Sequence, residues 1–297
     1  MSDGASNGLP TGLGATLIGP QTFAWGSRTF VMGIVNVTPD SFSGDGLLAG
    51  SGAEERVGEA VALATAMVEA GADILDIGGE STRPGHTAVP ADEEIARVVP
   101  VVRAVRAALP GMPVSIDTTK PAVAEAALDA GAHLVNDIWG VAEDDALPRL
   151  AAERGVPIVL MHNRAEAHYT TLLPEIVADL QRAIERALRV GVAWEDIIVD
   201  PGFGFGKTAE HNVAVLRDLA SLTILGRPIL LGASRKSTLG RILDLPADER
   251  LEATLATTVL AIASGVDIVR VHDVRENVRA ARVADAVVRD TWRVGDA

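Results

Sequence analysis

Carboxylates and cationic side chains recur where short apolar runs of this sequence end, and their types suggest a chemistry. Three aspartates, Asp76, Asp117 and Asp200, end runs rich in Val, Ile and Leu. Carboxylates accept paired N–H donors such as those of a guanidine-like heterocycle, whereas Arg and Lys clamp phosphoryl oxygens. The cationic set comprises Arg83, Lys236, Arg270 and His272. We therefore expect an anionic substrate, with internal salt bridges among these residues as the structural alternative.

A glycine-rich stretch at residues 201–208, PGFGFGKT, is comparable with the nucleotide-binding pattern GxxxxGK[ST]. Pro201 stands where that pattern needs its first Gly, and the stretch follows a late apolar run instead of the first one. We therefore expect no ATP binding here. Lys207 in this stretch is one of only three lysines, with Lys120 and Lys236, against 23 arginines. A compact, flexible donor is one reason to keep Lys at such positions, and a composition bias toward Arg is the other explanation for the scarcity.

Eight apolar runs alternate with amphipathic stretches, which is typical of parallel strands joined by crossover helices. The predicted strands are residues 30–36, 73–77, 113–117, 133–137, 157–161, 197–200, 228–232 and 267–271. The predicted helices are residues 53–70, 92–108, 121–130, 144–153, 174–190, 209–222, 250–264 and 274–290. Eight such units indicate an α/β fold of the (β/α)₈ TIM barrel type.

A recurring phrase supports eight equivalent units, because residues 69–76, 129–136 and 263–270 each combine a helix end, a Gly and a strand. An open doubly wound sheet is the alternative, but it would carry a Gly-rich dinucleotide turn after its first strand, and Asn36-Val37-Thr38-Pro39 is no such turn. We expect a single domain over residues 21–297, preceded by a loose N-terminal arm at residues 1–20 that is rich in Gly, Ser and Pro.

Polar residues fall at every predicted strand end, where the active site of such a barrel lies. They are Asn36, Asp76, Asp117, Asn136, Asp137, His162, Asn163, Asp200, Ser234, Arg270, His272 and Asp273. A polar residue here can also be the N-cap of the next helix, which is the interpretation we prefer for Asp137 and Asp273. Eight polar strand ends in register are difficult to explain as caps alone.

Composition narrows the possible environments and partners. The chain has 297 residues, 48% of them apolar, a net charge of −14 and no cysteine. The acidic balance argues against nucleic acid as a partner, and no apolar run reaches the roughly 20 residues that a membrane span needs. The first residues lack a basic segment followed by an apolar one, and absence of cysteine suits a reducing compartment. We therefore expect a cytoplasmic protein with no membrane contact.

At these strand ends the sequence closely resembles the dihydropteroate synthases, over roughly residues 25–290. The matching segments include residues 32–43 (MGIVNVTPDSFS), 76–85 (DIGGESTRPG), 115–118 (SIDT), 136–140 (NDIWG), 161–163 (MHN), 200–207 (DPGFGFGK), 234–237 (SRKS) and 270–274 (RVHDV). The resemblance implies a (β/α)₈ barrel, usually a homodimer, that condenses 6-hydroxymethyl-7,8-dihydropterin diphosphate with p-aminobenzoate to give 7,8-dihydropteroate in folate biosynthesis. Mg²⁺ is the implied cofactor.

The resemblance also implies a role for each matching residue. The pterin-binding residues are Asp76, Asp117, Asn136, Asp200 and Lys236. The residues expected to contact diphosphate are Asn36, which also helps to hold Mg²⁺, with Thr82, Arg83, Arg270 and His272. The p-aminobenzoate pocket is expected to contain Phe42, Pro84, Phe205 and Ser234. Four residues are expected to be catalytic: Asp117, Lys236, Arg270 and His272.

The implied reaction needs no covalent enzyme intermediate. Mg²⁺, Arg270 and His272 neutralise the departing diphosphate, and an ionised Asp117 supports positive charge on the pterin ring while the arylamine attacks. One departure concerns the first loop, where the family commonly has SFSDGG and this chain has SFSGDG at residues 41–46. The acid is displaced by one position, so no role is assigned to Asp45.

Two other functions share parts of this pattern. A methyltetrahydrofolate-binding methyltransferase barrel has a similar pterin pocket but needs no diphosphate clamp, so Arg270, His272 and the segment 234–237 count against it. A non-catalytic pterin-binding paralogue is disfavoured because the matched positions are intact, and a turnover assay with both substrates distinguishes it from the enzyme.

Overall fold

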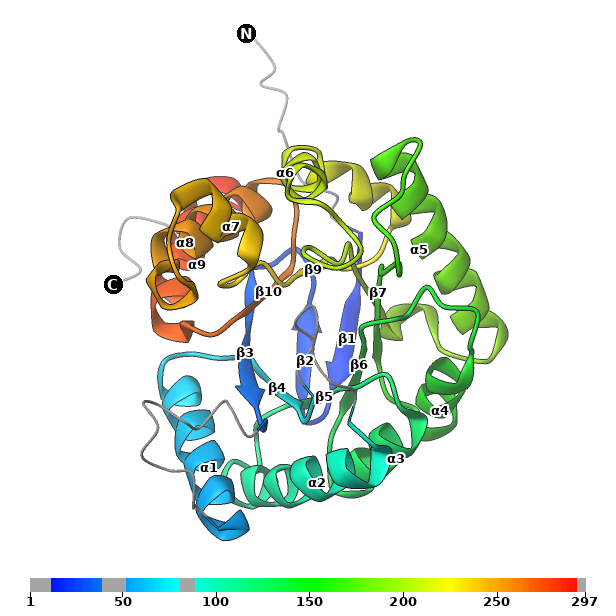
Figure 1. Cartoon of the computed structure of the whole chain (residues 1–297), viewed down its shortest axis with the longest axis vertical. Coiled ribbons are helices and arrows are strands. Elements are labelled where there is room, and N and C mark those ends of the chain that lie inside the picture. The colour runs from blue at the N-terminus through cyan, green and yellow to red at the C-terminus, as the bar shows by residue number, and fades with distance from the viewer. Residues whose placement is uncertain (1–11, 39–51, 81–88, 293–297) are drawn as a thin grey trace, which may run out of the picture.

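In the computed structural model, which describes residues 12–38, 52–80 and 89–292, eight parallel strands curve into a nearly closed barrel surrounded by helices (Figure 1). The strand order is β8-β7-β6-β5-β4-β3-β10-β9, and a parallel bridge between Val199 and Ile229 joins the first and last of these strands. The predicted single-domain (β/α)₈ barrel is therefore confirmed. No helix of the described ranges has the length and apolar character needed to cross a membrane.

The observed elements follow the prediction closely. The barrel strands are β3 (Phe30–Asn36), β4 (Ile74–Gly78), β5 (Val114–Asp117), β6 (Leu134–Asp137), β7 (Ile158–Met161), β8 (Ile197–Asp200), β9 (Leu230–Leu231) and β10 (Ile268–Val271). The helices are α1 (Ala53–Glu69), α2 (Ala91–Ala108), α3 (Pro121–Asp129), α4 (Ala146–Arg154), α5 (Leu172–Arg189), α6 (Ala209–Arg217), α7 (Ser237–Leu243), α8 (Leu251–Ala263) and α9 (Val274–Val288). Short 3₁₀ helices span Trp194–Asp196, Leu219–Leu225 and Ala247–Glu249.

Three differences from the prediction concern the second half of the barrel. Strand β9 keeps two of five predicted residues, and the helix predicted over 209–222 ends at Arg217, after which a separate 3₁₀ helix begins. Helix α7 was not predicted. The glycines of the recurring phrase do stop helices as predicted: Gly71, Gly131 and Gly265 have φ of +102°, +109° and +92°, which a side chain rarely tolerates.

A β-hairpin at the start of the described chain covers the bottom of the barrel, the end opposite the carboxyl ends of the strands. Its strands are β1 (Ala15–Ile18) and β2 (Gln21–Ala24), and it lies across the centre of the ring in Figure 1. Ile18 and Phe23 are buried in one cluster with Phe30 and with apolar side chains inside the barrel. Residues 15–20 therefore depart from the predicted loose arm, because burial of apolar side chains anchors them, whereas residues 1–11 lie outside the described part.

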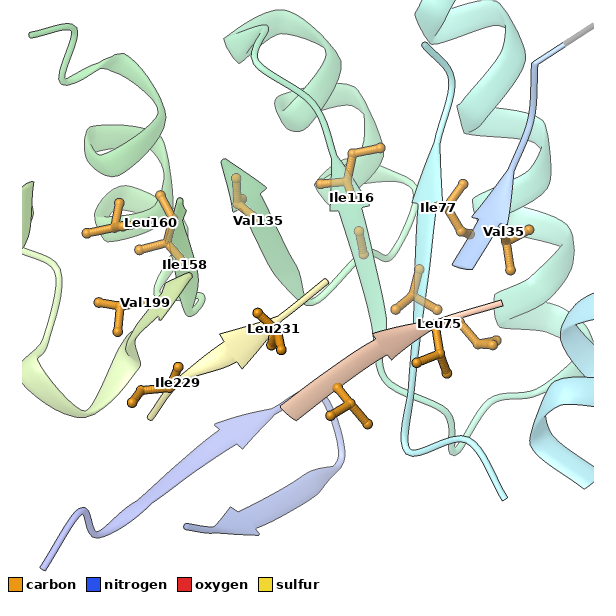
Figure 2. Packing of buried hydrophobic residues seen from close by; sticks show 14 of the residues in the cluster. Val35, Leu75, Ile77, Ile116, Val135, Ile158, Leu160, Val199, Ile229 and Leu231 are labelled. Carbon is orange, nitrogen blue, oxygen red and sulfur yellow. The ribbon is translucent and has the colours of Figure 1, made fainter. Parts of the chain in front are cut away.

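The barrel strands alternate between two apolar environments, as pleated strands must. Side chains such as Leu75 on β4, Ile116 on β5 and Leu160 on β7 face the surrounding helices, and Figure 2 shows them with other members of this apolar cluster. The intervening residues face the barrel interior, where Ile74 and Leu134 belong to the same apolar cluster as Ile18 and Phe23 of the hairpin. This alternation determines which side chains at the upper strand ends can reach the interior.

Candidate active site

The upper layer of the barrel interior is polar. Its residues lie two positions beyond those of the lower apolar layer on the same strands, so they point to the same interior face. The pairs, lower residue first, are Ile74 and Asp76 on β4, Leu134 and Asn136 on β6, Ile198 and Asp200 on β8, and Ile268 and Arg270 on β10. The predicted site residues of four strands therefore converge in one layer.

Arg270 connects the carboxylates of this layer across the barrel. Its Nε donates to Oδ2 of Asp76 at 2.5 Å, and its Nη2 donates to Oδ2 of Asp117 at 2.6 Å. Asn136 Nδ2 also donates to Oδ2 of Asp76, at 3.1 Å. The internal ion pairs considered as an alternative are therefore present, and they join residues expected to bind pterin to one expected to bind diphosphate.

These ion pairs leave part of the layer unsatisfied. Oδ1 of Asp76, Oδ1 of Asp117 and Oγ of Ser115 are buried and have no hydrogen-bond partner within the described residues. Buried polar atoms in folded proteins are nearly always paired, so an unpaired set facing one interior calls for an explanation. Two carboxylate oxygens and a hydroxyl can receive a ligand with several N–H groups. Ser115 was missed in the sequence, although its position two residues before Asp117 puts it on the same face.

Burial dominates the electrostatics of the carboxylates. It raises the pKa of Asp117 to about 7, against the opposing attraction of Arg270, and the nearby Asp76 raises it further. Burial also raises the pKa of Asp200 to about 6, although the Gly202 N–H and Lys236 oppose that shift. The charged contact with Arg270 favours the ionised form of Asp117. Burial nevertheless brings the pKa values of Asp117 and Asp200 close to neutral pH, as expected for groups in an active site.

Lys236 and Phe205 form the side of the site supplied by β8 and β9. The Lys236 Nζ lies 3.8 Å from the centre of the Phe205 ring, a cation–π contact. Burial, assisted by the positive charge of Arg270, lowers the pKa of Lys236 to about 8, while Asp200 opposes this shift. Asp200 accepts the Gly202 backbone N–H at 2.6 Å, which fixes its carboxylate at the strand end.

Ser234 and His272 form a second pair in the same region. Ser234 Oγ lies 3.0 Å from Nδ1 of His272 and accepts the His272 backbone N–H at 3.2 Å. Burial, with the positive charges of Arg235 and Arg270, lowers the pKa of His272 to about 3. The expected cationic set therefore loses one member, because His272 is a neutral donor or acceptor at neutral pH.

Asn36 stands beside the carboxylates, at the end of β3. It pairs with Gly78, which pairs in turn with Asp117, so a Cβ built on Gly78 would lie 3.8 Å from Asn36 Oδ1 and 3.5 Å from Asp117 Cβ. The Asn36 side chain has no hydrogen-bond partner in the part of the chain that the structure describes. That part also contains no group of three or more His, Cys, Asp or Glu able to hold a metal ion.

The remaining predicted residues lie elsewhere or outside the described ranges. Phe42, Thr82, Arg83 and Pro84 fall in the undescribed segments 39–51 and 81–88, as does Asp45. Asp137 is not a helix cap: it accepts the Trp139 N–H at 3.0 Å in the turn that follows β6. Asp273 does occupy the N-cap position of α9, but its side chain makes no cap hydrogen bond and instead binds Arg235.

Lys120 marks a charged cluster that sequence reasoning did not assemble. Its Nζ donates to Glu80, which follows β4, and to Oε2 of Glu94 on α2 at 2.5 Å. Glu94 is completely buried, so this ion pair links the ends of β4 and β5 to the first turn of α2. Its residues lie 14 to 40 positions apart, and only the barrel topology brings them together.

Comparison with known proteins places this geometry in a family. The profile of the pterin binding enzymes matches residues 32–272. The chain is 50% identical to the dihydropteroate synthase of Clostridium beijerinckii over 273 residues, which is 92% of this chain and 99% of the relative.

Solved structures agree with the sequence comparison. A dihydropteroate synthase from Clostridium difficile, determined in the presence of pteroic acid, superposes with a TM-score of 0.84 at 48% identity, covering 90% of this chain and 99% of that one. The Xanthomonas albilineans dihydropteroate synthase with 4-aminobenzoic acid gives a TM-score of 0.83 at 42% identity, covering 90% and 95%.

Proposed function

The chain belongs to the pterin-binding enzyme family, and from this premise we propose that it acts as a dihydropteroate synthase. It condenses 6-hydroxymethyl-7,8-dihydropterin diphosphate with p-aminobenzoate. The arylamine nitrogen forms a bond to the pterin methylene carbon, the bond from that carbon to the diphosphate oxygen breaks, and the amine loses a proton. The products are 7,8-dihydropteroate and diphosphate, so the chain is a transferase of folate synthesis.

One observation carries the assignment: the buried, unpaired oxygens of Asp76, Asp117 and Ser115 face the interior of a barrel of this family. A pterin ring presents amino and ring N–H donors along one edge, which match carboxylate acceptors in number and kind. Asn136 supplies an amide on the next strand. Asp200 and Lys236 complete the pterin-binding set from the opposite side of the barrel.

The diphosphate end of the substrate is assigned to Arg270 and His272, with Thr82 and Arg83 as further contacts from outside the described ranges. Arg270 keeps its charge, since its carboxylate neighbours raise its pKa despite burial. A guanidinium bound to Asp76 and Asp117 would lie where the pterin and diphosphate subsites join. It could therefore stabilise the negative charge that develops on the leaving diphosphate. His272 contributes a neutral hydrogen bond.

Mg²⁺ fits the residues that are present if the diphosphate supplies most of the ligands. Mg²⁺ commonly takes one or two protein oxygens together with phosphate oxygens and water. The unpaired side-chain oxygen of Asn36, beside the Asp117 strand end, is the protein ligand we propose. Bound there, the ion would neutralise charge on the leaving diphosphate.

The p-aminobenzoate pocket is assigned to Phe205 and Ser234, with Phe42 and Pro84 from outside the described ranges. The Phe205 ring offers an apolar face, and Lys236 next to it offers a positive charge near the aromatic carboxylate. Ser234 has its hydroxyl engaged with His272, so its contribution to the pocket would come mainly from its backbone and position.

Catalysis would depend on charge placed before the substrates arrive. An ionised Asp117 stabilises positive charge that develops on the pterin ring as the carbon–oxygen bond weakens. Arg270 holds the negative charge that develops on the leaving diphosphate, and Lys236 contacts the pterin. The neutral arylamine then attacks in the pocket beside Phe205.

A homodimer is the assembly we propose. Apolar side chains stand exposed on three consecutive helices: Ile242 and Leu243 on α7, Val259 and Leu260 on α8, and Val283 and Val287 on α9. Exposed apolar surface of this kind marks a protein contact. Sedimentation of the wild type and of Leu260→Glu tests this, with a monomeric wild type as the contrary result. The absence of cysteine supports a cytoplasmic location.

The decisive test is product formation. The protein is incubated with the pterin diphosphate, p-aminobenzoate and Mg²⁺, and 7,8-dihydropteroate is detected by mass spectrometry. Reactions without p-aminobenzoate, or with EDTA, are the controls and should give no product. Absence of product in the complete reaction would overturn the assignment, and full activity with EDTA would overturn the role of Mg²⁺.

A further inference from the structure

Lys207 points back into its own loop, which connects β8 to α6 over residues 201–208. Its Nζ donates to the carbonyl oxygens of Gly202 and Phe205, both at 3.1 Å, and lies 3.0 Å from Nδ1 of His162. An ammonium group has three N–H donors, so these three acceptors use all of them. The loop is therefore built around a lysine.

The contact of the His162 ring with Asp179 determines which ring nitrogen can accept a hydrogen bond from Lys207. Its Nε2 lies 3.1 Å from Oδ2 of Asp179 on α5, so the ring proton belongs on Nε2 and leaves Nδ1 free to accept. Burial, followed by the positive charge of Lys207, lowers the pKa of His162 to about 3 and keeps the ring neutral. Arg164 in turn holds Asp179, with Nη2 at 2.7 Å. A continuous polar chain thus joins α5 to the loop through the end of β7.

The loop backbone packs directly on that strand end. Gly202 has φ of +68°, and a Cβ there would lie 1.8 Å from the His162 carbonyl oxygen. Farther along, Gly204 N donates to Oδ1 of the buried Asn212 at 2.8 Å, and Asn212 Nδ2 donates to Thr238 of α7 at 2.9 Å. The loop is thus tied both to β7 and to the helix that follows Lys236.

Two site groups depend on this loop. Phe205 places its ring 3.8 Å from Lys236, and Gly202 gives its N–H to the Asp200 carboxylate. We propose that Lys207 is a positioning residue for the transferase reaction: its ammonium group holds residues 202–205 in the conformation that sets Phe205 against Lys236 and so forms the p-aminobenzoate pocket. This proposal rests on the proposed function.

Lysine suits this position for a physical reason. The three acceptors surround one compact ammonium, whereas the planar guanidinium of arginine spreads its donors in a fixed fork. A chain with 23 arginines nevertheless keeps Lys here. Burial lowers the pKa of Lys207 to about 7, and Asp200 opposes that shift, so the carboxylate and the three acceptors favour the charged form.

The absence of cysteine in this chain permits a clean test. Lys207→Cys introduces a single thiol, and alkylation with bromoethylamine converts it to an aminoethyl side chain of nearly the length and charge of lysine. We expect Lys207→Cys to raise the KM for p-aminobenzoate at least about tenfold with less than about a threefold change in the KM for the pterin diphosphate, and aminoethylation to reverse most of this. Hydrogen exchange of a peptide covering residues 201–208 should accelerate in Lys207→Cys and slow again after alkylation.

A neighbouring variant separates positioning from general weakening. Thr208→Ala removes the capping box of α6, in which Thr208 accepts the His211 N–H at 3.2 Å, but leaves the Lys207 contacts intact. It should leave both KM values unchanged. Unaltered KM values and exchange in Lys207→Cys, or an alkylated protein that stays as defective as its parent, would overturn the positioning role. An inactive wild type would overturn the proposed function instead, and the exchange measurement would still decide whether Lys207 orders the loop.

Discussion

The two ends of the barrel interior are built from the same strands, two residues apart, and have opposite designs. At the bottom, Phe23 and Ile18 of the hairpin pack on apolar residues such as Ile74, and the cluster is buried. At the top, Asp76 follows Ile74 on the same face, and buried oxygens remain unpaired. Burial of a large apolar side chain stabilises the fold by about 1.5–3 kcal/mol, whereas an unsatisfied buried polar group costs about 1–3 kcal/mol.

This difference implies a division of labour within one barrel. The lower layer stabilises the fold, and the upper layer keeps charges in a buried place where they would be unfavourable without a ligand. Mutations at the bottom should therefore change stability and leave turnover intact, and mutations at the top should do the reverse. The following predictions test this division, from the largest expected effect to the smallest.

Phe23→Ala should produce the largest effect. Phe23 is fully buried, with its ring centre 4.8 Å from that of Phe30 and 5.8 Å from that of Trp25. Removing such a ring should lower the free energy of unfolding by about 3–5 kcal/mol, measured by urea denaturation. The kcat of the folded variant should stay near that of the wild type. Leu17→Ala, on the exposed side of the same hairpin, should change stability by less than about 0.5 kcal/mol. A fall in kcat of folded Phe23→Ala would mean that the two layers are coupled.

Asp117→Asn should reverse this pattern at the top. The amide keeps the shape of the side chain but removes the charge opposite Arg270, so kcat should fall by about 10²-fold or more if the transition state loses roughly 3 kcal/mol. The fold should persist, as circular dichroism can show.

Asp137→Asn is the matched control, because burial also raises the pKa of Asp137 to about 7. Asp137 differs by facing away from the barrel interior and accepting the Trp139 N–H. Its kcat should stay within about twofold of the wild type, since an amide oxygen can accept the same N–H. Equal losses in the two variants would show that buried charge in general matters, and not charge in the upper layer.

The pH dependence sharpens the role of Asp117. Its pKa is raised to about 7 in the free protein, so it is increasingly protonated as the pH falls through 7. If only the ionised form supports the reaction, kcat/KM should drop about tenfold per pH unit below 7 and level off above it. The residual activity of Asp117→Asn should lack this acidic limb. A wild-type profile that is flat from pH 5 to 8 would contradict the assignment.

The contrast between the two layers also explains what could be predicted from sequence. Strand and helix periodicity are local signals, so the eight units and the polar strand ends, including Asp76 and Arg270, could be located before the structure. The hairpin could not, because its strands have four residues each and are defined by contacts with distant barrel residues. Helix α7 has seven residues, too few for a periodic pattern.

Contacts between residues far apart in the sequence could not be predicted from the sequence either. The charge state of His272 depends on burial beside Arg235 and Arg270, so its type suggested a cation that the structure does not support. Lys207 was conspicuous as one of three lysines, but its partner His162 lies 45 residues earlier. Residue type and position identified the candidates, and only the fold assigned their partners.

Apart from the control variants, Ser234→Ala should give the smallest effect. The Ser234 hydroxyl accepts the His272 backbone N–H at 3.2 Å, and within the described residues Nδ1 of His272, 3.0 Å away, is the acceptor that its own proton can reach. Donation to Nδ1 would place the ring proton on Nε2, where a neutral imidazole can still donate to a phosphoryl oxygen. Loss of one such hydrogen bond is worth about 1 kcal/mol, so kcat/KM for the pterin diphosphate should fall about threefold to tenfold.

Nitrogen NMR of the His272 ring provides the more direct measurement. The wild type should show a neutral ring protonated on Nε2 down to about pH 5, because burial lowers the pKa of His272 to about 3. Ser234→Ala should show a mixture of tautomers, whereas Phe23→Ala at the other end of the barrel should leave the ring signals unchanged. A wild-type ring protonated on Nδ1 would contradict this arrangement. Ser234 would then accept from both the backbone N–H and the Nδ1–H of His272, and Nε2 would carry no proton to donate to the substrate.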